Sequence, residues 1–176
     1  MNIRRFAATL FAAAALLAGS TAVASAATPQ PGFRAEARAI GMSTTQASSL
    51  QQRVDAVLAG QPGGRQVSAT KVEYDGLTVT LDPGYSAASS AKSVVSPFLT
   101  CAYGHLCMTV RGTNFDFYKC QLWYVNNWYG TSLFINNQTT GTVARFYGQA
   151  GNQIWTSTAY ESRNADWAPV WSLRPC

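Results

Sequence analysis

Charged side chains are scarce in this chain of 176 residues, making up 12% of it. There is a single histidine, His105, so a zinc site that needs two histidines is excluded. No Gly-x-Ser-x-Gly nucleophile elbow occurs, and the carboxylates that follow residue 98 (Asp116, Glu161 and Asp166) lack the pattern of a glycosidase pair. We therefore expect no catalytic residue and no enzyme. A serine triad built on His105 stays open, and an exposed loop residue is the favoured interpretation of this histidine.

Clustered positive charge is also missing. The formal net charge is +5, but lysines and arginines stand singly along the chain, as at Lys71, Arg111 and Arg163. A protein that binds nucleic acid or an anionic membrane is expected to carry a basic stripe. Beyond residue 26 no apolar run is long enough to cross a bilayer. We expect no nucleic-acid partner, no membrane insertion and a monomer.

Residues 1–26 have the pattern of a secretory signal peptide. Two basic residues, Arg4 and Arg5, precede the apolar run 6–18, and Ala24-Ser25-Ala26 supplies the small residues of a cleavage site. We predict cleavage after Ala26 and a secreted, extracellular product. The alternative, an N-terminal anchor helix, needs about 20 apolar residues, more than this run provides.

The chain has four cysteines, and an even number in an exported protein favours disulfides over thiol chemistry. Three pairings are open. The five residues between Cys101 and Cys107 contain Gly104, which suits a tight local loop. That pairing leaves Cys120 to bond with the last residue, Cys176, and we favour this arrangement.

Residues 27–84 predict a small module of helix and β-hairpin. Ser43 and Gln46 form a capping-box pattern ahead of apolar residues at helical spacing. Those apolar residues are Ala47, Leu50, Val54, Val57 and Leu58. A shorter helix is expected over 34–40. Asp75-Gly76, between two alternating runs, predicts a hairpin over 69–82 with positive φ at both turn positions. Because two strands and a helix are marginal alone, the module either packs on the following domain or is a pro-segment.

Residues 85–97, rich in Ser and Ala, predict a linker, and residues 98–176 predict an all-β domain. Short β-branched and aromatic runs alternate there with Gly and Asn turns. The expected strands are 106–110, 115–118, 121–125, 132–135, 142–147 and 153–158. The expected turns are 112–114, 126–127, 136–137 and 148–152. The fold class is therefore mainly β, with a sandwich that disulfides staple because its core is small.

Several motifs of residues 98–176 resemble those of a known family. They are Cys101-Ala-Tyr-Gly-His-Leu-Cys107, Cys120, Trp128-Tyr-Gly and Phe134-Ile-Asn-Asn-Gln-Thr-Thr140. Together they are similar to the peptidase inhibitor family numbered thirty-six, which consists of secreted bacterial proteins. The resemblance implies a βγ-crystallin-like domain of two Greek keys and inhibition of a secreted metallopeptidase. One departure lies in the first hairpin, where Val110, Phe115 and Phe117 stand in place of the family's two aromatics and a glycine.

Crystallin-like domains can bind calcium through paired Asn/Asp-rich motifs, and 136–141 matches one copy except at its last position, Gly141. Asn136, Asn137 and Thr140 are the candidate calcium ligands. Calcium prefers several carboxylate oxygens, whereas this segment supplies only neutral amides and hydroxyls. The favoured alternative is a structural turn in which Asn side chains hold the backbone. No other cofactor is expected.

Two segments are candidate contact sites for a partner. The disulfide loop 102–106 carries Tyr103 and His105, and the turn 126–130 carries Trp128 and Tyr129. A rigid loop binds a cleft with little ordering cost, and large aromatics anchor interfaces. For Trp128 a place in the core is the favoured alternative. The main hypothesis is an inhibitor that inserts a loop into a secreted peptidase. The alternatives are a carbohydrate or cell-wall binding module and a crystallin-like antimicrobial protein.

Overall fold

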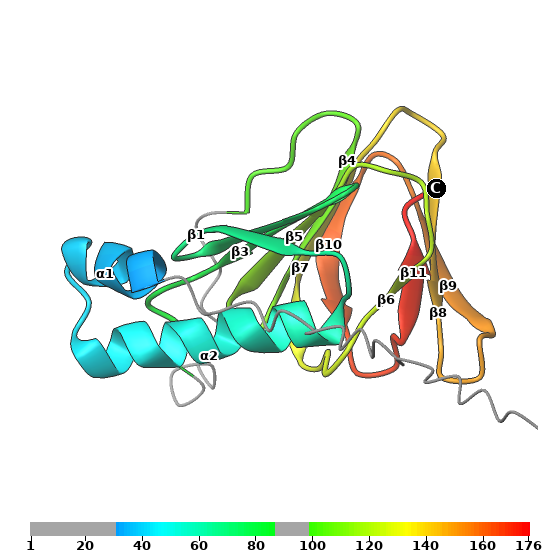
Figure 1. Cartoon of the computed structure of the whole chain (residues 1–176). Coiled ribbons are helices and arrows are strands. Elements are labelled where there is room, and N and C mark those ends of the chain that lie inside the picture. Colours follow the sequence, from blue (N-terminus) through cyan, green and yellow to red (C-terminus); the bar gives the residue numbers. More distant parts are fainter. Residues whose placement is uncertain (1–30, 87–98) are drawn as a thin grey trace, which may run out of the picture. The chain divides into compact units, whose positions relative to one another are not determined.

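Two helices and two antiparallel β-sheets are described in the computed structural model, which covers residues 31–86 and 99–176 (Figure 1). The expected mainly-β class is confirmed. The expected signal peptide lies outside the described residues, as does most of the expected linker. Pro31–Cys176 forms one compact unit. None of the helices described has the length and apolar character to cross a membrane.

The two helices precede every strand. Helix α1 spans Pro31–Ala39 and α2 spans Thr44–Gly60. The capping box is confirmed, because Ser43 Oγ accepts from Gln46 N at 3.2 Å and Gln46 Oε1 accepts from Ser43 N at 2.8 Å. Of the apolar residues that the spacing places on one face of α2, Ala47, Leu50 and Val54 are buried, whereas Val57 and Leu58 are half-buried.

Three strands follow: β1 (Arg65–Ser68), β2 (Lys71–Tyr74) and β3 (Leu77–Leu81). The hairpin of β2 and β3 is confirmed, with Tyr74 opposite Leu77. Its turn is not of the expected kind, however. Among the described residues positive φ occurs at Gly76 (106°) but not at Asp75. A two-residue turn of type II needs positive φ only at its second central position, which Gly76 supplies.

The hairpin belongs to a sheet with strands from beyond residue 98. These are β4 (His105–Val110), β5 (Thr113–Phe117), β7 (Thr131–Asn137) and β10 (Glu161–Asp166). Because β3 pairs with β5, the seven-stranded order is β1-β2-β3-β5-β4-β7-β10. The β-hairpin therefore packs on the later strands as part of their sheet.

The second sheet has four strands. They are β6 (Trp123–Tyr124), β8 (Val143–Tyr147), β9 (Gln153–Thr158) and β11 (Ser172–Arg174), in the order β6-β11-β8-β9. The strands after residue 98 form two halves, β4–β7 and β8–β11. In the first half, β6 leaves the seven-stranded sheet and pairs with β11 in the four-stranded sheet. In the second half, β10 leaves the four-stranded sheet and pairs with β7 in the seven-stranded sheet. Each half of the domain thus contributes one strand to the other half's sheet.

The sequence missed some of these elements. The strands β1, β10 and β11 were not expected. The hairpin of β4 and β5 turns at Arg111-Gly112 rather than at the expected 112–114. Both turn residues have positive φ, 50° and 65°. An arginine seldom takes that conformation, so the turn carries no sequence signal at its first position.

One face of the seven-stranded sheet holds the core. Cross-strand partners share a face, and Val79, Phe115, Met108 and Phe134 are successive partners across four strands. Helix α2 covers the β2–β3 end of this face, where Tyr74 Oη donates to Val57 O at 3.2 Å. The four-stranded sheet covers the other end through aromatic contacts such as Phe134 with Phe146. The opposite face carries Cys107 and Asp116, which are partners in register.

Candidate functional site: a disulfide-braced loop

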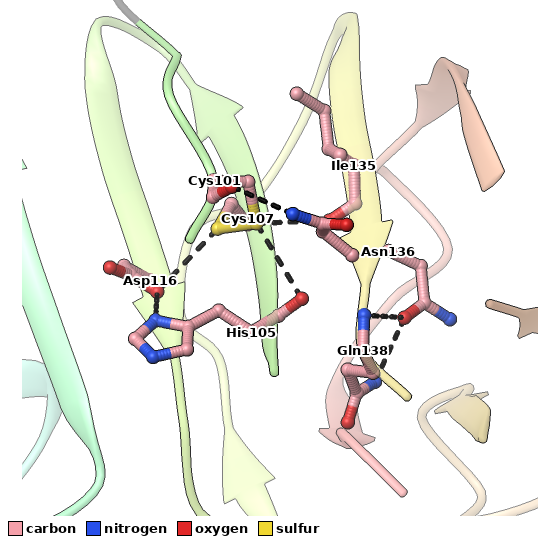
Figure 2. The surroundings of a disulfide bond; sticks show 8 residues. Cys101, His105, Cys107, Asp116, Ile135, Asn136 and Gln138 are labelled. Carbon is pink, nitrogen blue, oxygen red and sulfur yellow. Dashed lines mark hydrogen bonds and ion pairs between the residues drawn. A yellow bond between two sulfur atoms is a disulfide. The ribbon is translucent and has the colours of Figure 1, made fainter. Parts of the chain in front are cut away.

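Both disulfides form as the spacing favours. Cys101 bonds with Cys107, and Cys120 bonds with Cys176. The first bond ties Cys101, in the segment before β4, to Cys107 within β4 (Figure 2). Cys107 lies on the face of the sheet away from the core. The bond closes a loop of five residues beside Asp116 and the end of β7.

Hydrogen bonds fix the backbone of this loop at several points. Gly104 N donates to Asn137 O at 2.8 Å, and His105 N donates to Ala102 O at 3.2 Å. The side chain of Asn137 reaches back and donates to Cys101 O at 3.0 Å. Gly104 has φ of 88°, a conformation open to glycine at little cost. Tyr103 projects from this braced backbone with 72% of its surface exposed.

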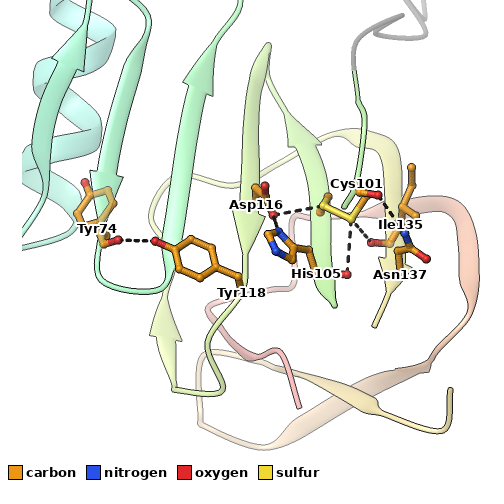
Figure 3. A network of polar contacts seen from close by, with 8 residues as sticks. Tyr74, Cys101, His105, Asp116, Tyr118, Ile135 and Asn137 are labelled. Carbon is orange, nitrogen blue, oxygen red and sulfur yellow. Dashed lines mark hydrogen bonds and ion pairs between the residues drawn. A yellow bond between two sulfur atoms is a disulfide. The ribbon is translucent and has the colours of Figure 1, made fainter. Parts of the chain in front are cut away.

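His105 supports the loop from its base (Figure 3). Its Nδ1 lies 2.6 Å from Asp116 Oδ1, and its ring lies against that of Tyr118 with 5.5 Å between centroids. Tyr118 Oη in turn donates to Tyr74 O at 3.0 Å. Within the described residues the hydrogen-bond partner of the ring is Asp116, and this contact holds the imidazole in place.

The second candidate segment divides between core and surface. Trp128 is only 8% exposed and packs on Phe115 at 4.8 Å and Trp167 at 5.4 Å between ring centroids. It lies on the core face of the large sheet, so the structure does not bring it to the Tyr103 loop on the opposite face. Tyr129 is exposed, with the Arg111 guanidinium 4.0 Å from its ring centroid.

The candidate calcium ligands have other partners. Asn136 is fully buried, and its Nδ2 donates to Ser157 O at 3.0 Å and to Ser157 Oγ at 3.2 Å. Its Oδ1 accepts from Gln138 N at 3.4 Å and Gln138 Nε2 at 3.0 Å (Figure 2). Thr140 is exposed, and among the described residues no group of three or more His, Cys, Asp or Glu side chains could hold a metal ion. The expected turn at 136–137 is wrong, because both residues end strand β7, but the Asn136 side chain does hold the backbone of the bend that follows. Calcium binding here stays a prediction.

The sequence alone indicated neither that Asp116 is the partner of His105 nor that the Asn137 side chain holds the loop backbone. Asp116 meets His105 because β4 and β5 pair in a register that places it opposite Cys107. That register depends on the Arg111-Gly112 turn, for which the sequence has only Gly112 as a signal. Comparisons with protein-family models, with curated proteins and with solved structures give no match.

Proposed function

We propose that this chain is an exported, disulfide-stabilised binding protein that inhibits a secreted metallopeptidase by inserting the loop 102–106 into its cleft. The observation that carries the proposal is the exposure of Tyr103 on a backbone fixed at both ends. The disulfide and three hydrogen bonds restrain the loop before any partner arrives. Binding then costs little loop ordering, which is the main way in which rigid inhibitors gain affinity.

The chemistry of the loop suits a protein partner. Tyrosine is enriched among the residues that dominate binding energy, because it offers a large apolar ring with a polar tip. Between Cys101 and Cys107 the loop contains no Asp, Glu, Lys or Arg, and the side chain of its one histidine, His105, pairs with Asp116. Insertion therefore desolvates few charges. The choice of a metallopeptidase as the target rests on the family resemblance of residues 98–176.

The strand arrangement supports the crystallin-like part of the proposal. In each half, the fourth strand pairs with the first: β7 with β4, and β11 with β8. A fourth strand that returns beside the first is the mark of a Greek key. The third strands, β6 and β10, are exchanged between the sheets, which locks the two halves into one domain.

The test is the residual activity of a panel of thermolysin-like metallopeptidases after incubation with the purified, oxidised protein at micromolar concentration. We expect dose-dependent loss of activity for at least one member. A serine peptidase of similar size is the control, because a crowding or aggregation effect would lower its activity as well. Full activity across the metallopeptidase panel would refute the proposal.

A second candidate function is carbohydrate binding, and one observation favours it. Tyr124 is 69% exposed, and Trp171, also exposed, lies on the neighbouring segment, where Val125 N donates to Trp171 O at 3.0 Å. Exposed aromatic rings of this kind can stack on sugars. The test is co-sedimentation with insoluble cell-wall polysaccharide, which Tyr124→Ala should weaken if this surface is the site.

A further inference from the structure

A cavity of about 690 Å³ lies on the core side of the large sheet, at the junction between α2 and the four-stranded sheet. Helix α2 forms one wall with Ala56 and Val57, and β6 with the segment after it forms another. The sheet contributes an apolar floor that includes Val79, Phe115 and Phe117. Its volume falls in the range of pockets that hold small organic ligands.

The charges around this cavity have one sign. Arg53 on α2 and Arg111 in the β4–β5 turn both line it, and none of the described lining residues carries a carboxylate. Neither arginine forms an ion pair in the described part of the chain. The cavity thus combines an apolar floor with a rim that carries two arginines and no lining carboxylate.

Two buried N–H donors at the cavity lack acceptors. They are Nε1 of Trp123, a residue only 3% exposed, and Nε of Arg111, and neither has a hydrogen-bond partner among the described residues. Both residues line the cavity. A buried donor without an acceptor destabilises the fold, so such groups normally have some hydrogen-bond partner. Here the missing partner is an acceptor.

The environment of Arg53 adds a third indication. Its guanidinium donates to Asp82 O at 2.7 Å and to Gly112 O at 2.8 Å, which holds it at the cavity edge. Burial lowers the pKa of Arg53, and the charge of Arg111 lowers it further, while Asp82 and Tyr85 act in the opposite direction. A negatively charged ligand group nearby would offset the cost of burying the Arg53 charge, which is the largest cause of this shift.

We propose that this cavity binds a small amphipathic organic anion, with an apolar aromatic or aliphatic body on the sheet floor and a carboxylate- or sulfonate-type head that accepts from Trp123 Nε1 and Arg111. The site is on the opposite face of the sheet from the Tyr103 loop. Ligand binding here is therefore independent of the proposed peptidase inhibition, and either function can fail without the other.

Two probes that share one ring system test the role of charge. They are 8-anilino-1-naphthalenesulfonate, which carries a sulfonate, and N-phenyl-1-naphthylamine, which lacks it. Both become fluorescent in apolar surroundings. In titrations of the folded protein we expect saturable binding of the sulfonate probe, about tenfold or more tighter than the neutral probe, because charge-assisted hydrogen bonds form only with the sulfonate. Equal affinity, or no saturable binding, would overturn the proposal.

Single substitutions then locate the head group. Arg111→Gln and Trp123→Phe should each weaken the sulfonate probe by about threefold to tenfold and change the neutral probe by less than about twofold. Arg163→Gln is the matched control, since Arg163 also stacks on aromatic rings, those of Phe134 and Trp155, but does not line the cavity. An equal effect of Arg111→Gln and Arg163→Gln would contradict the assignment.

A substitution that fills the cavity tests where the apolar body of the ligand binds. Ala56 is exposed on α2 and lines the cavity, so Ala56→Trp places an indole in it without disturbing the buried face of the helix. We expect this variant to retain its thermal unfolding midpoint and to lose binding of both probes. Retention of binding by a folded Ala56→Trp variant would place the probes elsewhere and refute the site. This variant also decides the matter if Arg111→Gln or Trp123→Phe fails to fold.

Discussion

Val79 in β3 is the cross-strand partner of Phe115 in β5, and this pair joins strands from opposite sides of residues 87–98. Val79 is fully buried. All five tryptophans follow residue 98, so tryptophan fluorescence reports on the later strands. Val79→Ala should destabilise the protein by about 2 kcal/mol and shift the unfolding transition seen by tryptophan fluorescence.

The matched control is Val67→Ala, the same change at a half-buried position of β1 at the edge of the sheet. We expect it to cost less than about 1 kcal/mol. If Val79→Ala leaves the tryptophan transition unchanged while lowering a separate transition in far-ultraviolet circular dichroism, the hairpin folds as an independent module and the shared sheet is wrong.

The two disulfides should differ in their contributions to stability. They close loops of very different length, with sequence separations of 6 for Cys101–Cys107 and 56 for Cys120–Cys176. In the chain-entropy model the short loop contributes about 2 kcal/mol and the long loop about 4 kcal/mol. Replacing both cysteines of the long loop by alanine should therefore lower the denaturation midpoint more than the same replacement in the short loop. The reverse order in urea titrations would contradict this prediction.

The pH dependence of stability should show a feature from Tyr74. Burial raises the pKa of Tyr74 from 10.0 to about 12. Because the folded-state pKa is the higher one, the contribution is complete below about pH 10 and is lost as the pH rises to about 12. The loss amounts to roughly 2–3 kcal/mol. Tyr74→Phe removes the ionising group, so its free energy of unfolding should fall less steeply over this window; parallel curves for the two proteins would exclude Tyr74 as the cause.

Asn136 should act as a structural residue. Asn136→Ala removes the hydrogen bonds that this fully buried side chain makes with Ser157 and Gln138 and should cost about 2–3 kcal/mol. The exposed Thr140→Ala should change stability by less than about 0.5 kcal/mol. Addition of millimolar calcium should leave the thermal midpoint at its value in EDTA. A calcium-dependent rise that Thr140→Ala abolishes would instead establish the calcium site.

Local signals in the sequence were sufficient where a few neighbouring residues determine the structure. The capping box of Ser43 and Gln46, the hairpin at Gly76 and the disulfide loop around Gly104 are of this kind. Each depends on backbone geometry within about six residues. The sequence could therefore place α2, the first hairpin and the braced loop.

Features that depend on register between distant strands were not predictable in the same way. The strand β10 is polar and mostly exposed, so it lacks an apolar alternation and is recognised only by its pairing with β7. Asp116 becomes a partner of His105 through strand register. The cavity needs α2, β5 and β6 together, and no local pattern brings Arg53 near Arg111.

The proposed inhibition depends most directly on Tyr103, and a paired substitution isolates it. Tyr103 and Tyr124 are almost equally exposed, at 72% and 69%. Tyr103 lies in the loop before β4 of the seven-stranded sheet, whereas Tyr124 lies in β6 of the four-stranded sheet. The decisive measurement is the inhibition constant of the wild type, Tyr103→Ala and Tyr124→Ala against the most sensitive metallopeptidase. We predict a loss of about thirtyfold or more for Tyr103→Ala and less than about twofold for Tyr124→Ala. Equal inhibition by the wild type and Tyr103→Ala, or no inhibition by any of the three, would contradict the account.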